Sequence, residues 1–245
     1  MAQIVLAIAL PPLLALYAAI VLLVMDTDTA PAQYALIIPL AYVLGSVPWG
    51  FLIGMAVKGV DIRQYGSGKI GTSNVLRTAG GTFAALTLVL DLSKGLLAVL
   101  LARVVTDEPL LQVAAGLGVL AGHNWSVFMG FKGGRGISPG LGALLIMQPV
   151  AAAIALASFI PITLLSKYLS LGSMLSVIVA FFASLAMVLL DHGSSTYLWY
   201  TGIGGAIVLW QHRDNAQRLI QGTERRLGQR TERIEEAPIP GTGPG

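Results

Sequence analysis

Three glycine-rich, basic segments of this sequence carry residue types that could hold a phosphate group. They read "GSGKIGTSNVLR" at 66–77, "GHNWSVFMGFKGGRG" at 122–136 and "QHRDNAQRLIQGTERR" at 211–226. Glycine lets a ligand approach backbone N–H groups closely, and an arginine guanidinium can hold two oxygens of one phosphate. Together the segments predict an anion site, although the first alone is also typical of a flexible connector.

The first segment suits a phosphate but does not match a nucleotide-binding P-loop. A P-loop in this register needs Gly at position 63 and Ser or Thr at position 70, where the chain has Arg63 and Ile70. We therefore exclude that class of NTPase. If a helix begins near Ser73, its N-terminus would add free N–H groups to the site. The donors and cations of this segment are Ser67, Gly68, Lys69, Thr72, Ser73, Asn74 and Arg77.

The second and third segments repeat this pattern at the ends of apolar runs. Gly133 and Gly134 precede Arg135 directly, and a simple membrane anchor needs charge but no adjacent glycines. In the third segment, helical spacing puts His212 and Asn215 on one face. The arginines at 225, 226, 230 and 233 are better explained by contact with anionic lipid. The stretch "KYLSLGS" at 167–173 adds two further hydroxyl groups, Ser170 and Ser173.

The rest of the chain is apolar enough to form membrane helices that position these segments. Its 245 residues are 55% hydrophobic and only 11% charged, and the mean hydropathy is +0.77, which excludes an ordinary soluble domain. The sequence predicts an all-α, polytopic helical membrane protein. The apolar runs, mostly near the ~20 residues that cross a bilayer, cover 3–25, 34–57, 82–102, 109–129, 141–165, 171–190 and 195–211.

Composition also excludes several kinds of chemistry. The chain has no cysteine and three scattered histidines, which argues against disulfides, thiolate catalysis and a metal centre. Its net charge of +3 is too small to indicate nucleic-acid binding. We expect no metal, no nucleic-acid partner and no obligatory protein partner. The run at 3–25 lacks a basic start and a clear cleavage site, so we expect a retained helix there instead of a signal peptide.

The placement of Lys and Arg predicts the orientation in the membrane. The positive-inside rule puts 58–80 in the cytoplasm, but simple alternation would then put the arginine-rich tail outside. The run 141–165 contains Pro149 and Pro161, so we predict two short segments there that enter and return on one side. All three glycine-rich segments then face the cytoplasm. Of the 15 Lys and Arg, only Lys94 and Arg103 lie elsewhere.

Asp91 and Lys94 are the charges expected deep in the membrane. A spacing of three residues puts them on one face of a helix. Charges at that depth are costly unless they are paired or face a polar cavity. We expect a structural ion pair more than a direct catalytic role.

In order and spacing, these pieces resemble the bacterial membrane glycerol-3-phosphate acyltransferases that use an acyl phosphate as donor, the PlsY family. "GSVPWGFLIG" at 45–54 and "DLSKG" at 91–95 match as well, so the resemblance runs from about residue 34 to 226. It implies seven membrane helices, some of them short, in the bacterial cytoplasmic (inner) membrane, with the active site on the cytoplasmic side. We divide the chain into an extra N-terminal helix and loop (1–33), the acyltransferase domain (34–226) and a disordered tail (227–245).

The resemblance also implies the reaction and its residues. An acyl group would pass from acyl phosphate to the 1-hydroxyl of sn-glycerol 3-phosphate, giving lysophosphatidic acid and inorganic phosphate, the first step of phospholipid synthesis, without a cofactor. Carried over by position, the catalytic set comprises Ser67, Arg77, Arg135, His212, Asn215 and Glu224. The substrate-binding set comprises Gly68, Ser73, Asn74, Gly133 and Gly134, with Ser170 or Ser173.

The sequence departs from the family pattern at three of these places. The family usually has Asn at the position of Lys69, Thr at Ser73 and Lys at Arg135. Serine keeps the hydroxyl donor of threonine. Arginine keeps the charge of lysine but replaces a point donor by a planar fork. The role of Lys69 stays unassigned.

Two acceptors for the hydroxyl proton remain open, namely His212 and a phosphate oxygen of a substrate. The acyltransferases with Asp five residues after a catalytic His are excluded, since Phe128, Tyr197 and Gln217 occupy those places. A different class, an anion or phospholipid transporter without chemistry, would use the same loops to select a phosphate. Against that class, the polar segments gather at one membrane surface and not at the midplane.

Overall fold

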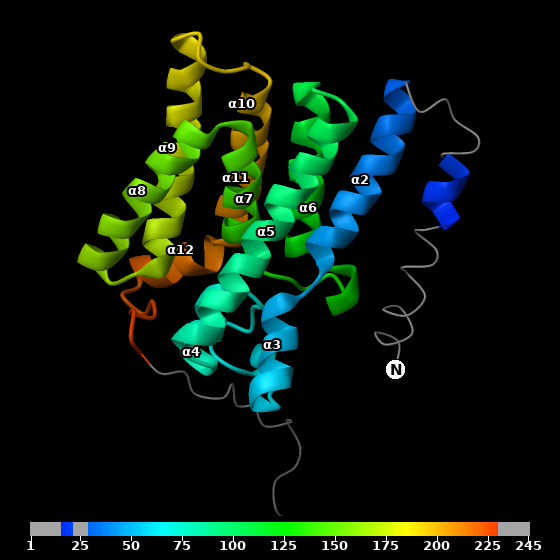
Figure 1. Cartoon of the computed structure of the whole chain (residues 1–245). Helices are drawn as coiled ribbons and strands as arrows, with labels where there is room; N and C mark the ends of the chain where they lie inside the picture. Colours follow the sequence, from blue (N-terminus) through cyan, green and yellow to red (C-terminus); the bar gives the residue numbers. More distant parts are fainter. Residues whose placement is uncertain (1–15, 22–28, 230–245) are drawn as a thin grey trace, which may run out of the picture.

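The structure, a computed structural model, describes residues 16–21 and 29–229, and the regular elements within these ranges are all helical. Long helices stand side by side, and α3, α4 and α12 gather at one end of the bundle (Figure 1). The labelled elements are α2 (Ala30–Ser46), α3 (Trp49–Lys58), η1 (Ile62–Gln64), α4 (Thr72–Thr78), α5 (Gly81–Val105), α6 (Pro109–Asn124), η2 (Val127–Met129), α7 (Ile137–Met147), α8 (Pro149–Ser166), α9 (Leu169–Leu189), α10 (Tyr197–Trp199), η3 (Tyr200–Gly204), α11 (Gly205–Gln211) and α12 (Arg213–Ile220).

The expected all-α membrane fold is confirmed. Within the described residues, four helical stretches are long and apolar enough to cross a bilayer, namely Ala30–Lys58, Gly81–Val105, Pro149–Ser166 and Leu169–Leu189. The first contains a break between α2 and α3 at Val47 and Pro48, because proline has no N–H to continue the helical ladder. α10, the π-helix η3 and α11 follow one another directly and form a further apolar helix over 197–211.

Most of the predicted N-terminal helix at 3–25 lies outside the described residues. The part that is described, 16–21, is helical, and the Tyr17 hydroxyl donates a 2.9 Å hydrogen bond to the carbonyl of Ala35 on α2. Residues 230–245 of the predicted tail, with two of its arginines, also lie outside the described ranges.

The chain reverses where the prolines predicted it, but only one of the two segments is short. α7 has 11 residues, whereas α8 has 18 and is long and apolar enough to cross a bilayer. The two helices meet at Gln148. α7 leads away from the end that carries α4 and α12, and α8 leads back toward it (Figure 1). Pro149 starts α8, as the sequence indicated. Pro161 was expected to interrupt a segment, but it lies inside α8 without ending it, as membrane helices tolerate.

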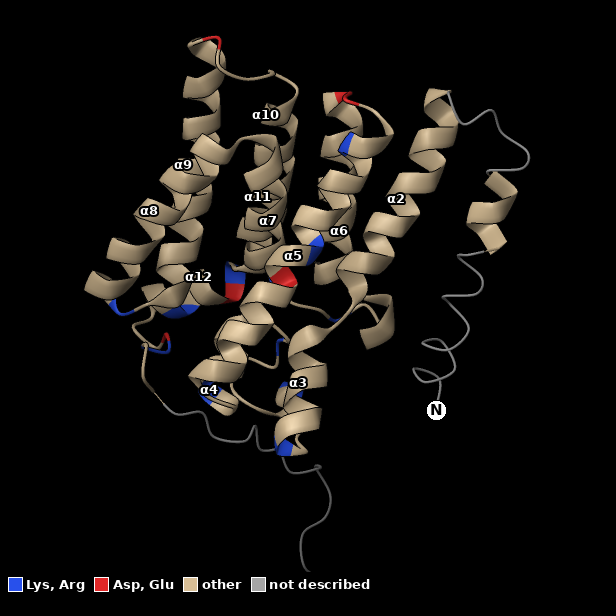
Figure 2. Ribbon diagram, in the orientation of Figure 1, with Lys and Arg blue, Asp and Glu red and all other residues tan. Residues whose placement is uncertain are grey.

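The charges separate along the bundle axis. The end with α3, α4 and α12, called the basic end below, carries most of the Lys and Arg, while acidic residues mark the opposite tips (Figure 2). The three glycine-rich segments all lie at the basic end, so sequence positions more than a hundred residues apart meet there. The Asp91 and Lys94 pair of α5 lies between the two ends, as its position in the apolar run predicted.

Glycine lets α5 and α7 cross closely enough to fix the second glycine-rich segment against the bundle. A methyl group on Gly142 would overlap the carbonyl oxygen of Leu92, and one on Gly95 would overlap that of Pro139. Small residues at such crossings let helix backbones approach in membranes, where no hydrophobic force drives helices together. α2 and α6 cross in the same way at Gly45 and Gly122.

We expect Gly142→Ala to destabilise the protein by about 1–3 kcal/mol, the usual cost of overpacking. Gly140→Ala is the matched control, because this glycine also lies inside α7 yet a methyl group there meets no atom closer than 3.8 Å. Both changes gain the same helix propensity. Unfolding midpoints of the purified variants in detergent measure the difference, and equal midpoints would contradict the close crossing.

Candidate active site

A cavity of about 440 Å³ opens at the basic end and is lined by residues of α4, α5, α6, α7, α8, α9, η3, α11 and α12 and of the loops between them. One part of the lining is polar and the other is apolar, so the cavity suits an amphiphilic ligand. The polar lining is Lys69, Thr72, Ser73, Arg77, Asp91, His123, Arg135, Ser138, Ser170, Ser173, Ser176, Tyr200, Thr201, His212, Asn215 and Glu224. The apolar lining includes Leu92, Leu120, Leu144, Phe159, Val177 and Val208.

Three cations from two segments face this cavity. Arg77 lies on α4, Arg135 follows the Gly133–Gly134 turn, and Lys69 lies in the loop before α4. The Nε atoms of Arg77 and Arg135 are buried without a hydrogen-bond partner among the described residues. Buried donors of this kind are normally satisfied, so both guanidinium groups are suited to an anion that the cavity would receive.

Burial and repulsion from neighbouring arginines lower the pKa of all three cations. The pKa of Arg135 falls to about 10, first because of burial and then because of Arg218. Burial, followed by the charge of Arg225, also lowers the pKa of Arg77, and burial followed by Arg135 lowers that of Lys69. Arg135 still carries its proton at neutral pH. An anion between these groups would relieve the repulsion.

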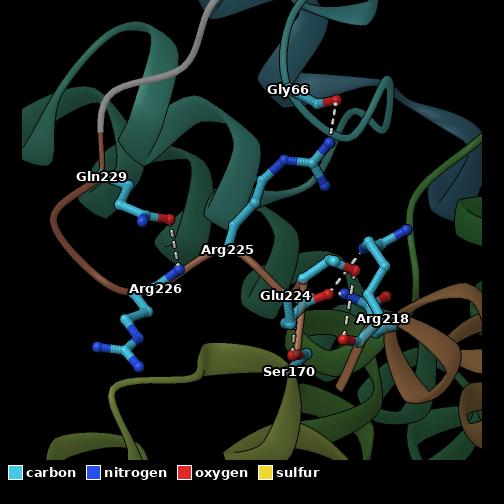
Figure 3. Close-up of polar contacts among 9 residues, drawn as sticks. Gly66, Ser170, Arg218, Glu224, Arg225, Arg226 and Gln229 are labelled. Atoms are coloured by element: carbon cyan, nitrogen blue, oxygen red, sulfur yellow. Dashed lines mark hydrogen bonds and ion pairs between the residues drawn. The ribbon is translucent and has the colours of Figure 1, made fainter. Parts of the chain in front are cut away.

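Glu224 ties the third segment to α9 and α12 (Figure 3). Its Oε1 accepts hydrogen bonds from Ser170 (3.0 Å) and Asn215 (2.8 Å). Its Oε2 pairs with Nε of Arg218 at 2.8 Å. The next residue, Arg225, donates from Nη2 to the carbonyl of Gly66 at 3.0 Å. The carboxylate thus orients three neighbours, and the segment after α12 connects directly to the first glycine-rich loop.

His212 follows the last membrane helix and lines the cavity. Its Nδ1 lies 2.8 Å from the carbonyl oxygen of Val208, and a carbonyl only accepts, so Nδ1 carries the proton of the neutral ring. Burial lowers the pKa of His212 to about 4, and the nearby Arg135 lowers it as well. Nε2 is therefore a neutral acceptor at physiological pH.

Several predicted site residues lie behind the cavity wall. Asn74 is fully buried, and its Nδ2 contacts the carbonyls of Ile62, Tyr65 and Lys69 at 2.8, 3.1 and 2.9 Å. Its Oδ1 accepts from the backbone N–H of Ser67 at 3.2 Å. This side chain therefore shapes the first loop from within. Ser67, Gly68, Asn74, Gly133 and Gly134 are absent from the cavity lining, and their contact with substrate stays a prediction.

Both candidate serines of α9 line the cavity, with different surroundings. The hydroxyl of Ser170 donates to Glu224, whereas that of Ser173 has no hydrogen-bond partner among the described residues. Sequence reasoning missed Tyr200 and Thr201 in the wall and left Lys69 without a role. The first two lie in an apolar run with no local signal. The burial of Lys69 near Arg135 arises only in the tertiary fold, so the sequence around Lys69 does not indicate it.

Comparison with known proteins assigns the chain to a family of membrane acyltransferases. A sequence profile described as Glycerol-3-phosphate acyltransferase matches residues 35–222, and the chain belongs to that family, which confirms the resemblance. The protein is 44% identical to the glycerol-3-phosphate acyltransferase of Rubrobacter xylanophilus over 196 residues, covering 80% of this chain and 96% of that one. Identity to the enzyme of Synechococcus sp. (strain CC9902) is 43% over equal shares.

Solved structures give the same result. The crystal structure of PlsY (YgiH), an integral membrane glycerol 3-phosphate acyltransferase in its glycerol 3-phosphate form, superposes with a TM-score of 0.73 at 34% identity, covering 80% of this chain and 96% of that one. The lysophosphatidic acid form of PlsY gives a TM-score of 0.72, again at 34% identity, with 80% of this chain and 95% of that one covered. The helix expected at 3–25 precedes the residues that the family profile matches.

We predict that Glu224→Gln loosens the segment around α12. The amide nitrogen would replace one of the two oxygens to which Ser170, Asn215 and Arg218 donate, and the charge would be lost. Losing hydrogen bonds to a charged group costs about 1.5–3 kcal/mol. Amides in 212–227 should therefore exchange with deuterium about tenfold faster or more. Asp214→Asn is the control, because its ion pair with Arg213 is half exposed. Equal exchange in the two variants would contradict the bracing role.

Proposed function

We propose that this protein transfers a fatty acyl group from acyl phosphate to the 1-hydroxyl of sn-glycerol 3-phosphate, giving lysophosphatidic acid and inorganic phosphate. Family membership supports the acceptor and the product. The observation that supports the donor is a cavity in which buried, unpartnered guanidinium groups adjoin an apolar compartment. An acyl phosphate has this same division between a charged head and a hydrocarbon chain.

The proposed chemistry depends on charge and alignment more than on a strong base. An acyl phosphate is already activated, since phosphate leaves once the hydroxyl oxygen has added to the carbonyl carbon. Two anionic substrates must approach each other, and Arg77, Arg135 and Lys69 would offset their repulsion. Such preorganised charge is commonly the largest contribution to catalysis.

His212 would orient the attacking hydroxyl. Because Nδ1 is committed to the Val208 carbonyl, the lone pair of Nε2 is available to accept a hydrogen bond from the substrate hydroxyl. The proton could pass to Nε2 or to a phosphate oxygen. The low pKa of His212 makes the imidazole a weak base, which supports the phosphate oxygen as final acceptor.

The basic end is proposed to face the cytoplasm of a bacterial inner membrane. The concentration of Lys and Arg there (Figure 2) agrees with the positive-inside rule. Glycerol 3-phosphate would enter from the aqueous side, and the acyl chain would lie among the apolar side chains between the helices.

Purified protein tests this proposal directly. Incubation with palmitoyl phosphate and glycerol 3-phosphate should form lysophosphatidic acid and phosphate in equal amounts, and palmitoyl-CoA should not replace the donor. Product from palmitoyl-CoA alone would overturn the donor assignment. If folded protein forms no product with either donor but moves glycerol 3-phosphate across a vesicle membrane, the transporter alternative holds.

Arg135→Ala should lower kcat/KM about a hundredfold or more, by comparison with removal of one oxyanion donor. Arg103→Ala is the control, since this arginine lies at the opposite end, half exposed, 3.8 Å from Asp107. Steady-state release of phosphate measures both. Near-normal turnover in Arg135→Ala would remove Arg135 from the reaction.

The pH dependence of the reaction tests the state of His212. Since its pKa is about 4, against about 6.5 for free histidine, the ring is neutral above roughly pH 5 and loses that state only as pH falls further. Dividing the rate of the wild type by that of His212→Asn cancels the ionisation of the substrates. We expect this ratio to stay constant between about pH 5.5 and about pH 8. An inflection near pH 6.5 would show an ordinary histidine.

A further inference from the structure

A buried charged cluster adjoins the cavity and has no part in the reaction described so far. Asp91 and Lys94, one turn apart on α5, are each about 1% exposed and form an ion pair with Oδ1 and Nζ 2.8 Å apart. Nζ of Lys94 also donates to the carbonyl of Val47 at 3.1 Å, where α2 gives way to α3. Ionisable pairs in membrane interiors are expensive to bury and usually serve a function.

His123, in the last turn of α6, extends this cluster to the second glycine-rich segment. Its Nδ1 lies 3.7 Å from Oδ1 of Asp91, and a methyl group on Gly134 would collide with its Nε2. The backbone N–H of Gly134 donates to the carbonyl of His123 at 2.9 Å, and that of Gly133 to Asn124 at 3.1 Å. The turn before Arg135 therefore lies directly on the end of α6.

These contacts argue against His123 as a base. One edge of its ring faces Asp91 and the other faces the backbone of Gly134, and the residue is 3% exposed. The Nδ1 edge faces a buried carboxylate, and Nδ1 makes no hydrogen bond among the described residues. The Nε2 edge is covered by the glycine turn, although His123 and Asp91 both contribute to the cavity wall. The imidazole ring is instead placed to fix the position of the Gly133–Gly134 turn, which carries Arg135.

We propose that Asp91, Lys94 and His123 are positioning residues for Arg135. The ion pair on α5 holds the imidazole in place, and the imidazole supports the Gly133–Gly134 turn, so that the guanidinium of Arg135 points into the cavity. The contacts of Lys94 with Val47, of Asp91 with His123 and of His123 with Gly134 each join different elements. The cluster thus connects α5, α6 and the break after α2 to one functional side chain. This inference rests on the proposed function, because acyl transfer is its readout.

A double-mutant cycle on kcat/KM tests the positioning role. We expect a loss of about tenfold for His123→Ala and about a hundredfold for Arg135→Ala, with still only about a hundredfold when both are combined, because a displaced arginine and an absent one are equivalent. Arg77→Ala provides the matched background, since Arg77 lies on α4 and is not carried by the Gly133–Gly134 turn. There the two losses should multiply to about a thousandfold.

A second variant guards against misfolding. Asp91→Asn combined with Lys94→Met removes both charges and leaves neither unpaired in the interior, and it should show the same dependence on Arg135. Unfolding midpoints confirm that each variant is folded. If the wild type is active but the losses multiply in the Arg135 background as they do in the Arg77 background, the positioning role is wrong. If the wild type itself forms no lysophosphatidic acid, it is the proposed function that fails.

Discussion

The constraint on which this structure depends is the burial of several cations around one cavity, close to further arginines. Arg77, Arg135 and Lys69 face the same space, and burial together with repulsion from neighbouring arginines lowers the pKa of all three. Left to itself, such a cluster would move its side chains to water, where a charge is solvated. It persists because the backbone around each cation is fixed independently, and this arrangement suits a phosphate that neutralises all three.

Three kinds of contact fix that backbone. Asn74 occupies the middle of the first loop and bonds its carbonyls from inside. Glycines at the α5–α7 crossing bring the second segment against the bundle. Glu224 of the third segment accepts hydrogen bonds from Ser170 on α9 and from Asn215 and Arg218 on α12. Each segment is thus secured by neutral groups or by its own carboxylate, which leaves the cations free for a ligand.

The sequence predicted the class of fold and the meeting of the three segments, because hydropathy, proline and the placement of Lys and Arg report directly on membrane helices. Pro149 marked the break between α7 and α8. Pro161 did not mark another, since a membrane helix can absorb a proline whose freed carbonyl finds other partners. The ion pair of Asp91 and Lys94 also followed from spacing alone.

The sequence did not predict which polar side chains line the cavity and which lie behind its wall. Ser73 and Asn74 are neighbours of similar polarity, yet one lines the cavity and the other is buried behind it. Which side chain faces a ligand depends on the rotation of a loop, and that rotation is set by tertiary hydrogen bonds. The same holds for His123, whose ring contacts Gly134 only because α6 ends where it does, and for Glu224, whose partners come from two other places in the chain.

One measurement tests most directly whether the cations await an anion. The unfolding midpoint of the wild type should rise when glycerol 3-phosphate is added, because a ligand that binds only the folded state stabilises it. Arg135→Met keeps an apolar stem but removes one charge, so it should unfold at a higher temperature than the wild type without ligand and lose most of the ligand-dependent rise. A variant that is less stable than the wild type and keeps the full rise with glycerol 3-phosphate would contradict this account.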